Sequence, residues 1–229
     1  MRGEELAVIR RLPLFAEMSE AHFDSLMKAA LLQRFPKQVV LIEEGHRPDF
    51  LHVVVEGLVE LFSQHRSRET TIDIIRPVTT FILAAVATDE VYLKSARTLT
   101  PARILLVPAQ AVRDMLTRDP DFARAMIHEL ALRYRGIVRT LKNEKLRSGS
   151  ERVANWIIRT SQDGEKSGSI VLTYDKRTLA SHLGMTPESL SRAFSHLADY
   201  GVRCHGRKIE ISDRSALLSF AAPDPLIDG

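Results

Sequence analysis

Residues 176–211 carry the clearest structural signal in the chain, and their sequence is KRTLASHLGMTPESLSRAFSHLADYGVRCHGRKIEI. Within it, Gly184 suits the left-handed conformation that ends many helices, because glycine has no Cβ to clash there. Thr186 and Pro187 follow as a helix cap and a first-turn proline. We therefore predict two helices joined by a tight turn, Lys176–Leu183 and Pro187–Tyr200, which is a helix-turn-helix arrangement.

Polar side chains near the start of the second predicted helix are candidates for contacts with DNA bases. Arginine can form two hydrogen bonds with guanine, glutamate can accept one from cytosine, and serine can contact thymine. The residues of these types at this helix start are Glu188, Ser191 and Arg192. Backbone or secondary contacts with DNA are expected from Thr178, Thr186, Ser189, Arg207 and Lys208. The alternative is that Glu188 and Arg192 form only a solvated pair one helical turn apart.

A short hairpin is predicted after this helix, from the segments Val202–Cys204 and Lys208–Ile211. Such a wing would carry Arg207 and Lys208 to the phosphates of DNA. Cys204 is the only cysteine, which excludes an internal disulfide and an iron–sulfur cluster held by four thiolates of one chain. It is either a small apolar residue of the hairpin or a redox switch, whose oxidation would weaken DNA binding.

Upstream, a long helix is predicted from Asp119-Pro120-Asp121 to about Leu146. Its apolar residues recur at alternating spacings of three and four, as in a coiled-coil seam, and they are Ile127, Leu130, Tyr134, Ile137 and Leu141. The seam indicates a dimer axis, and the alternative is a helix packed on its own domain. The Ser- and Gly-containing segment Lys145–Ser150 is predicted to be a hinge.

The region from Val39 to Val107 alternates short apolar segments with turn-prone pieces, which is typical of an antiparallel sandwich or barrel. The predicted strands are Val39–Ile42, Leu51–Val55, Leu58–Phe62, Thr71–Ile75 and Ile104–Val107. Residues 4–34 are predicted to be helical, with a break at Leu12–Phe15. After a helix at Glu151–Thr160, a polar loop at Asp163–Ser169 and a strand at Ile170–Thr173 are expected.

Composition and the absence of certain motifs exclude several classes of function. The 229 residues are 45% hydrophobic and 27% charged, and no apolar run approaches the roughly 18 residues of a membrane span. The N-terminus lacks the layout of a secretory signal, so the cytoplasm is expected. A net charge of +3 permits DNA binding without requiring it. The sequence contains no catalytic motif. The segment Gly164–Gly168 has the composition of a phosphate-binding loop but lacks its spacing. An enzyme and a regulator that binds only a protein partner are the rival interpretations.

The order of these parts resembles the CRP/FNR family of regulators, over nearly the whole chain. The resemblance rests on Leu12–Phe15, on the stretch from Glu44-Gly45 through Asp49–Gly57, and on Gly184–Arg192, which is similar to the FNR branch. It implies an α+β fold with an N-terminal antiparallel β-roll (a jelly roll, like cyclic-nucleotide-binding domains), a dimerisation helix and a C-terminal winged helix. The implied domains are 1–117, 118–147 and 148–229. The implied function is that of a homodimer on palindromic double-stranded DNA with TTGAT-type half-sites, partnered by RNA polymerase if it is an activator.

Cyclic-nucleotide binders of this family use a Gly-Glu pair and an Arg-Ser pair, and the matching stretches here are Thr80–Ala85 and Lys94-Ser95. The first pair is missing, and lysine cannot reproduce the fork of arginine on a phosphate, so cAMP is not expected. The signals that the resemblance still allows are nitric oxide sensed through haem and a redox signal. The remaining alternative is a FixK-like regulator that acts without a ligand. The proposed sensor pocket comprises Phe81, Ile82, Leu83, Lys94 and Ser95, with Val86 beside it, and the candidate haem ligands are His22, His46, His52 and His65. No metal site is predicted.

Overall fold

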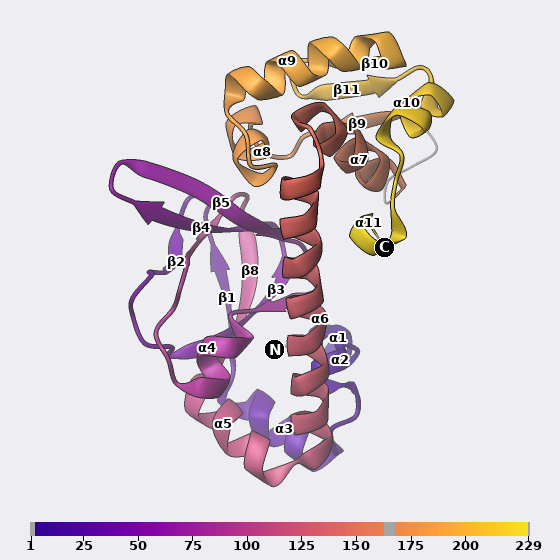
Figure 1. Ribbon diagram of the computed structural model, residues 1–229. Coiled ribbons are helices and arrows are strands. Elements are labelled where there is room, and N and C mark those ends of the chain that lie inside the picture. The colour runs from indigo at the N-terminus through magenta and orange to yellow at the C-terminus, as the bar shows by residue number, and fades with distance from the viewer. Residues whose placement is uncertain (1–2, 163–167, 229) are drawn as a thin grey trace. The chain divides into compact units, whose positions relative to one another are not determined.

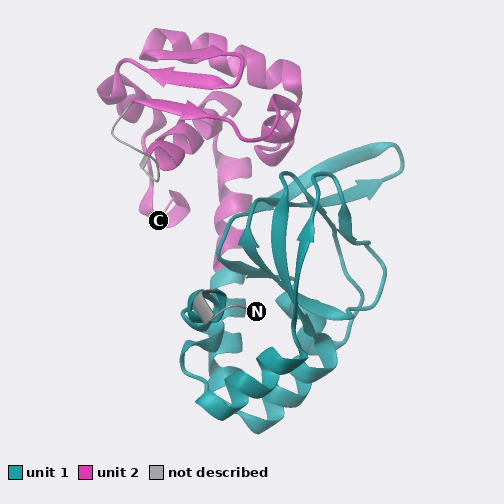
Figure 2. Cartoon of the chain, turned by 180° about the vertical axis from the view of Figure 1, so that it is seen from behind, with its two compact units in different colours: residues 1–134 teal, residues 135–229 magenta. Residues whose placement is uncertain are grey.

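The computed structural model describes residues 3–162 and 168–228. It divides the chain into two compact units, residues 1–134 and 135–229 (Figure 2), and the boundary falls inside helix α6 (Pro120–Leu146). Within the described ranges, no helix is long and apolar enough to cross a membrane. The same ranges contain no group of three or more His, Cys, Asp or Glu side chains that could hold a metal ion.

The first unit is built on two four-stranded sheets, in which every strand pair is antiparallel (Figure 1). Their strand orders are β1-β8-β3-β6 and β2-β7-β4-β5. The strands are β1 (Leu31–Phe35), β2 (Val40–Ile42), β3 (Phe50–Glu56), β4 (Val59–His65), β5 (Arg68–Ile75), β6 (Thr79–Phe81), β7 (Ser95–Thr98) and β8 (Ala102–Pro108). The predicted antiparallel β-domain is therefore confirmed.

Alternate residues of β3 contribute to two separate cores, because successive side chains of a strand point to opposite faces. Leu51 and Val53 belong to a cluster with Phe15 and Phe122 from the helices, whereas Val54 belongs to a cluster made almost wholly of strand residues. The helices of this unit are α1 (Gly3–Arg10), α2 (Pro13–Ala16), α3 (Glu20–Ala29), α4 (Leu83–Thr88), α5 (Ala109–Arg118) and the first part of α6.

The predicted N-terminal helix extends too far. Helix α3 ends at Ala29, Ala30 is extended, and β1 pairs antiparallel with β8 over Leu31–Phe35. Tertiary pairing with a neighbouring strand thus overrides the helical spacing of the apolar residues in this segment. The sequence also gave no assignment between residues 79 and 98, where β6, α4 and β7 lie.

Gly57 makes the turn between β3 and β4 possible. Its φ is +84°, and a Cβ at this position would lie 2.4 Å from the carbonyl oxygen of Pro101. Gly45 has a similar φ of +87°, but a Cβ there would meet open space. Any larger residue at Gly57 would therefore have to displace neighbouring backbone, a constraint that Gly45 does not share.

Helix α6 begins as the sequence predicts. The Asp119 carboxylate accepts hydrogen bonds from the backbone N–H groups of Asp121 and Phe122, at 3.0 and 2.9 Å, so it caps the helix. Four of the five predicted seam residues are exposed, namely Ile127, Tyr134, Ile137 and Leu141. The fifth, Leu130, is half-buried and packs against the helical core of its own unit.

The second unit contains the end of α6, a bundle of short helices and a small sheet of order β10-β11-β9 (Figure 1). Its elements are α7 (Gly149–Gln162), β9 (Ser169–Val171), α8 (Lys176–His182), α9 (Pro187–Leu197), a 3₁₀ turn (Ala198–Tyr200), β10 (Val202–His205), β11 (Lys208–Ile211), α10 (Arg214–Ala221) and α11 (Pro225–Asp228). The predicted loop at Asp163–Ser169 lies mostly outside the described residues. The two predicted helices and the wing are all confirmed.

The predicted hinge segment, Lys145–Ser150, contains the break between two helices. Helix α6 continues to Leu146 and α7 begins at Gly149, which leaves two residues between the helices. Ser148 accepts a hydrogen bond from the N–H of Glu151, and the Glu151 carboxylate accepts one from the N–H of Ser148. This reciprocal capping box fixes where α7 starts, and the hinge itself stays a prediction.

Candidate nucleic-acid interface

The start of α9 is fixed by local hydrogen bonds. The Thr186 hydroxyl accepts from the N–H of Ser189 at 3.2 Å, and Pro187 occupies the first helical turn. Gly184 takes a φ of +64° in the turn before it. Helix α8 starts in the same way, with the Asp175 carboxylate accepting from the N–H of Thr178 at 2.7 Å. The predicted cap and left-handed turn are therefore confirmed.

An apolar layer holds the two helices together. Its members are buried and come from α8, the turn and α9, and they are Leu179, Ala180, Leu183, Leu190, Ala193, Phe194 and Leu197. Because these positions use one face of α9, the opposite face is left to polar side chains. Glu188, Ser191 and Arg192 are all exposed on it.

The exposed face of α9 carries both a negative and a positive side chain, Glu188 and Arg192. Arg192 donates to the Ser189 hydroxyl at 3.1 Å through one nitrogen of its guanidinium. Hydrogen bonds from its own backbone N–H and from the Thr186 hydroxyl lower the pKa of Glu188 from its ordinary value, and the charge of Arg192 adds to the effect. The helix start thus offers an ionised acceptor and a guanidinium donor to a ligand outside the protein.

The wing is the hairpin of β10 and β11, with Gly206 in its turn at a φ of +58°. Arg207 and Lys208 are both exposed on it. Lys208 forms an ion pair with Glu210 at 2.7 Å, which partly neutralises its charge. Arg207 is therefore the stronger candidate of the two for a phosphate contact.

A groove of about 340 Å³ lies between α9 and β10. It is lined by Lys176, Pro187, Leu190, Ser191, Phe194, Ser195, Ala198, Val202, Arg203, Cys204 and His205. Sequence reasoning missed three of its cationic or titratable members, Lys176, Arg203 and His205. The predicted strand ended at Cys204, one residue short of His205, so the face that Arg203 and His205 share on β10 was not recognised.

Cys204 lies in this groove and is half-buried. Its sulfur is 4.0 Å from the carbonyl oxygen of Gly206, a weak contact for a thiol. Ser191, one of the predicted base-contacting residues, lines the same groove. The thiol is therefore beside the predicted DNA-contacting residues, as the sequence suggested.

The predicted sensor pocket is divided in the structure. Phe81 is buried in the strand cluster of the β-roll, whereas Leu83 and Val86 are buried in the cluster that contains the helices. Ile82 lies between them with a φ of +64°, in the left-handed region that branched residues rarely adopt. These apolar residues are therefore divided between two cores, and their role in sensing stays a prediction.

Lys94 and Ser95 lie beside carboxylates. Burial lowers the pKa of Lys94, and the charge of Arg133 adds to this, while Asp73 opposes it. The Ser95 hydroxyl accepts a hydrogen bond from the N–H of Glu44, whose carboxylate accepts one from Ser63. An anion bound at Lys94 would therefore be repelled by the charge of Asp73.

The four candidate histidine ligands have different environments. His22 pairs with Asp119 at 2.9 Å, His46 lies near Glu43, and His65 is exposed. Only His52 is buried, on β3 beside the ring of Phe81 with 5.2 Å between ring centroids. Burial lowers its pKa to about 4, although a hydrogen bond to the Phe50 backbone opposes this, and its Nδ1 has no hydrogen-bond partner among the described residues. A neutral imidazole with an unbonded nitrogen has the chemistry of a metal ligand.

Comparison with known proteins identifies the two parts of the chain. Residues 32–119 match the model of the cyclic nucleotide-binding domain, and residues 151–220 match that of the Crp-like helix-turn-helix domain. A search of curated protein sequences gave no match.

Solved structures extend the likeness to nearly the whole chain. A protein of Ruegeria pomeroyi DSS-3, provisionally described as a cyclic nucleotide binding protein, is 28% identical over 98% of this chain and 100% of its own, with a TM-score of 0.66. A protein of Silicibacter pomeroyi DSS-3, provisionally described as a cAMP-binding regulatory protein, is 27% identical over 97% of this chain and 100% of its own, with a TM-score of 0.65. FixK2 of Bradyrhizobium japonicum is similar in fold, with 20% identity over 85% of this chain and 98% of its own and a TM-score of 0.74. A cyclic nucleotide-binding domain followed by a Crp-like helix-turn-helix places this chain in the CRP/FNR family of DNA-binding transcription regulators, which are not enzymes.

Proposed function

We propose that the protein regulates transcription as a homodimer bound to a palindromic site with FNR-like half-sites of the TTGAT type. The observation that carries this proposal is the exposed start of α9, where Glu188, Ser191 and Arg192 share one face of a capped helix. The order Glu, then Ser and Arg three and four residues later, is the one that resembles the FNR branch. Guanine, cytosine and thymine each offer a partner to one of these side chains.

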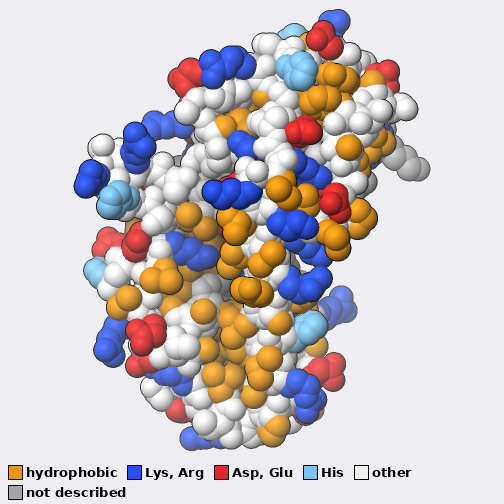
Figure 3. All heavy atoms as spheres, in the orientation of Figure 1, with side chains coloured by type: hydrophobic (Ala, Val, Ile, Leu, Met, Phe, Trp, Pro, Cys, Tyr) orange, Lys and Arg blue, Asp and Glu red, His pale blue; other side chains and the backbone are white. Residues whose placement is uncertain are grey.

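The exposed face of α6 supports a symmetric dimer. Ile127, Tyr134, Ile137 and Leu141 have between 53% and 68% of their surface exposed, which is a large apolar area for a single helix to leave in water. Hydrophobic side chains run along this helix in the space-filling view (Figure 3). Two copies joined at this seam would set two recognition helices about 34–36 Å apart, so that each reads one half-site.

In this proposal the chain has three functional regions, a sensor at residues 1–117, the dimerisation helix at 118–147 and the DNA-binding region at 148–229. Thr178, Thr186, Ser189, Arg207 and Lys208 contribute backbone or secondary contacts with DNA, and the groove adds Lys176 and Arg203 to them. An operator placed to favour activation would make RNA polymerase a further partner.

Arg192→Ala should remove base discrimination at one position of each half-site. A bidentate arginine–guanine contact is worth about 1–3 kcal/mol of discrimination, and the homodimer makes one at each half-site, so affinity for the TTGAT palindrome should fall about 30-fold or more. Affinity for a duplex already altered at that guanine should change little. Fluorescence anisotropy at fixed salt, with the palindrome TTGAT-N4-ATCAA and single-base variants, measures both values.

Arg207→Ala is the matched control, because it removes the same kind of side chain from the wing. It should weaken binding to all duplexes alike and reduce the salt dependence of binding by about two counterions, one for each copy in the dimer. Equal losses on every duplex for Arg192→Ala would instead place Arg192 on the DNA backbone, and the base-contact assignment would be wrong.

For the signal, we propose a ligand other than a cyclic nucleotide, namely nitric oxide through haem, or a redox signal. The two solved relatives near 28% identity are provisionally described as cyclic-nucleotide or cAMP binders. Here, however, the matching stretch Thr80–Ala85 has no carboxylate for a ribose, and the negative charge of Asp73 acts on the lysine expected to meet the phosphate. Among the four candidate histidines we propose His52 as an axial haem ligand, because it is the buried one, and we propose Cys204 as a redox switch. The alternatives are a constitutive FixK-like regulator and a cyclic-nucleotide-responsive one.

One binding series distinguishes these signals. Specific binding to the palindrome without any addition, unchanged by any effector, would favour the constitutive alternative. We expect no response to cAMP, and a response either to haem with nitric oxide under anoxia or to peroxide. A His52→Ala variant should lose a haem absorption band if His52 is the ligand, and Cys204→Ser should lose a response to peroxide. Tighter binding with cAMP alone would overturn the proposal for the signal.

A further inference from the structure

Two helices meet at a short junction in the second unit, where only Arg147 and Ser148 separate α6 from α7. The junction is held on one side by Arg152 of α7. Its guanidinium donates to the carbonyl oxygens of Arg147 at 3.0 Å and Glu144 at 3.4 Å, at the end of α6. It also donates to Leu183 at 3.0 Å and Gly184 at 3.3 Å, at the turn before the recognition helix. One side chain therefore ties the end of α6 to the helix-turn-helix.

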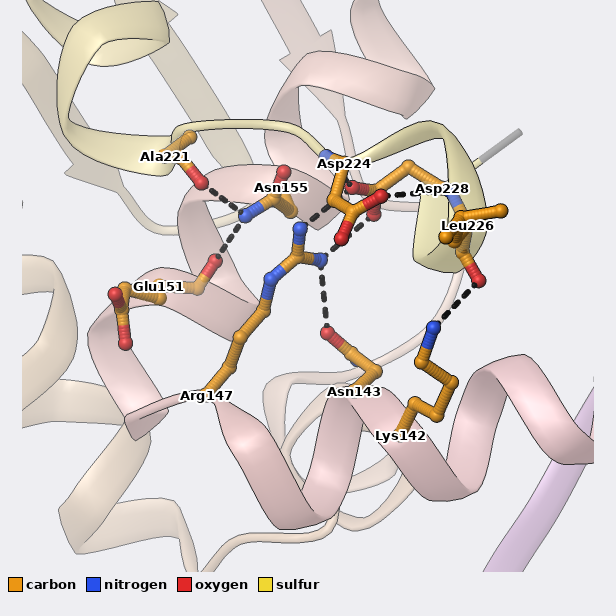
Figure 4. Close-up of polar contacts among 9 residues, drawn as sticks. All are labelled: Lys142, Asn143, Arg147, Glu151, Asn155, Ala221, Asp224, Leu226 and Asp228. Carbon is orange, nitrogen blue, oxygen red and sulfur yellow. Dashed lines mark hydrogen bonds and ion pairs between the residues drawn. The ribbon is translucent and has the colours of Figure 1, made fainter.

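The other side of the junction is held by the C-terminal segment. Arg147 donates to both carboxylate oxygens of Asp228, at 2.7 and 2.6 Å, and both side chains are largely buried, with 7% and 11% of their surface exposed (Figure 4). Arg147 also donates to the Asn143 side chain at 3.1 Å. A bidentate, desolvated ion pair of this kind is strong and geometrically specific.

Further contacts hold the same segment in place. Lys142 donates to the carbonyl oxygen of Leu226 at 3.2 Å, and the N–H of Asp224 donates to the Asp228 carboxylate at 2.8 Å. The buried Asn155 of α7 donates to the carbonyl oxygen of Ala221 at 2.7 Å (Figure 4). Burial would raise the pKa of Asp228, but the hydrogen bonds from Arg147 and Asp224 outweigh it and lower the pKa, so the pair is ionised near neutral pH.

The segment lies on a side of α6 that the proposed dimer seam does not use. Successive residues of a helix are about 100° apart, so Lys142, Asn143 and Arg147 point about 100° or more away from the stripe of Ile137 and Leu141. A second copy packed on that stripe would leave these contacts intact. The segment and the dimer partner therefore do not compete for the helix.

We infer that residues 222–228 act as a brace that locks α7, and with it the helix-turn-helix, onto the end of α6. Arg147 and Asp228 are positioning residues, because they act on DNA binding only through the junction. The inference rests on the proposed function, since a fixed junction matters most when two recognition helices must meet two half-sites at once. A loose junction would spread each recognition helix over many positions and lower the effective concentration of the second one at its half-site.

The test compares Asp228→Asn and a deletion of residues 223–229 with Asp24→Asn, which makes the same charge change at an exposed position of α3. Both brace variants should bind the palindrome about tenfold more weakly, and a duplex with a single half-site within about twofold of the wild type. Amide hydrogen exchange at residues 144–152 should be faster in both. Asp228→Asn leaves the charge of Arg147 buried without its partner, which by itself destabilises the fold. The deletion exposes Arg147 to water and so avoids this effect. A change seen in both variants is therefore due to the loss of the brace.

The inference and the proposed function fail in different ways. If the wild type prefers the palindrome and both variants match it, the brace is wrong and the proposed function stands. If the wild type shows no preference for the palindrome, the proposed site is wrong, and hydrogen exchange at the junction alone decides the brace. Unchanged exchange at residues 144–152 in both variants overturns the brace in either case.

Discussion

Ile137→Glu should convert the protein from dimer to monomer. Ile137 is 64% exposed at the centre of the seam on α6, between Tyr134 and Leu141. In a symmetric dimer the two new carboxylates would face each other in an apolar interface, and the desolvation of each charge costs several kcal/mol. Affinity for the palindrome should then fall about 100-fold or more, because the second half-site no longer adds to the first. Sedimentation equilibrium measures the mass, and anisotropy measures the affinity.

His128→Glu is the matched control. It introduces the same carboxylate at an exposed position of the same helix, about 140–180° away from Ile137 and Leu141. We expect it to stay dimeric and to bind the palindrome as the wild type does. If Ile137→Glu also remained a dimer with unchanged affinity, α6 would not be the dimer axis, and the exposed stripe would serve another partner.

Local chemistry explains why the helix-turn-helix and the wing could be predicted from the sequence, whereas no element was predicted for residues 212–228, where α10 and α11 lie. Gly184, Thr186 and Pro187 each meet a requirement of one backbone position, and that requirement does not depend on distant parts of the chain. The same reasoning should have found the capping box of Ser148 and Glu151, because Ser followed three residues later by Glu is its signature. Treating Ser and Gly as signs of flexibility concealed it.

Tertiary contacts explain what could not be predicted. Strand β1 exists because Leu31–Phe35 pairs with β8, some 70 residues away in the sequence, and no local pattern records that pairing. The division of Phe81 and Leu83 between two cores depends on the left-handed Ile82, a conformation that no sequence rule assigns to isoleucine. The brace is similar, since Arg147 and Asp228 meet only after the second unit has folded.

The same holds for His52, whose surroundings no sequence pattern could give. The alternating strand predicts a buried or exposed histidine equally well, depending on register. In the structure its imidazole is 4% exposed and lies against Phe81. Burial lowers its pKa from 6.5 to about 4, with the hydrogen bond to the Phe50 backbone opposing the shift.

This burial should make the protein less stable as the pH falls from 7 toward 4. Below pH 6.5 the unfolded chain binds a proton on His52 that the folded chain does not accept, so the unfolded state is favoured as the pH falls toward 4. Between about pH 7 and about pH 5 the free energy of unfolding should drop by about 2 kcal/mol from this group. Asp119, Glu151 and Asp228 have lowered pKa values and titrate below this range. Denaturant unfolding at the two pH values measures the drop.

Two variants separate titration from packing. His52→Leu removes the titrating group, so its drop between the two pH values should be about 2 kcal/mol smaller than that of the wild type. Phe81→Leu weakens packing at the same place but keeps the imidazole, so it should lower stability by a similar amount at both pH values. Equal drops in the wild type and in His52→Leu would show that the imidazole takes up its proton within the folded protein. The strand core would then be open to water at β3. The burial of His52, on which its proposal as a haem ligand rests, would not hold.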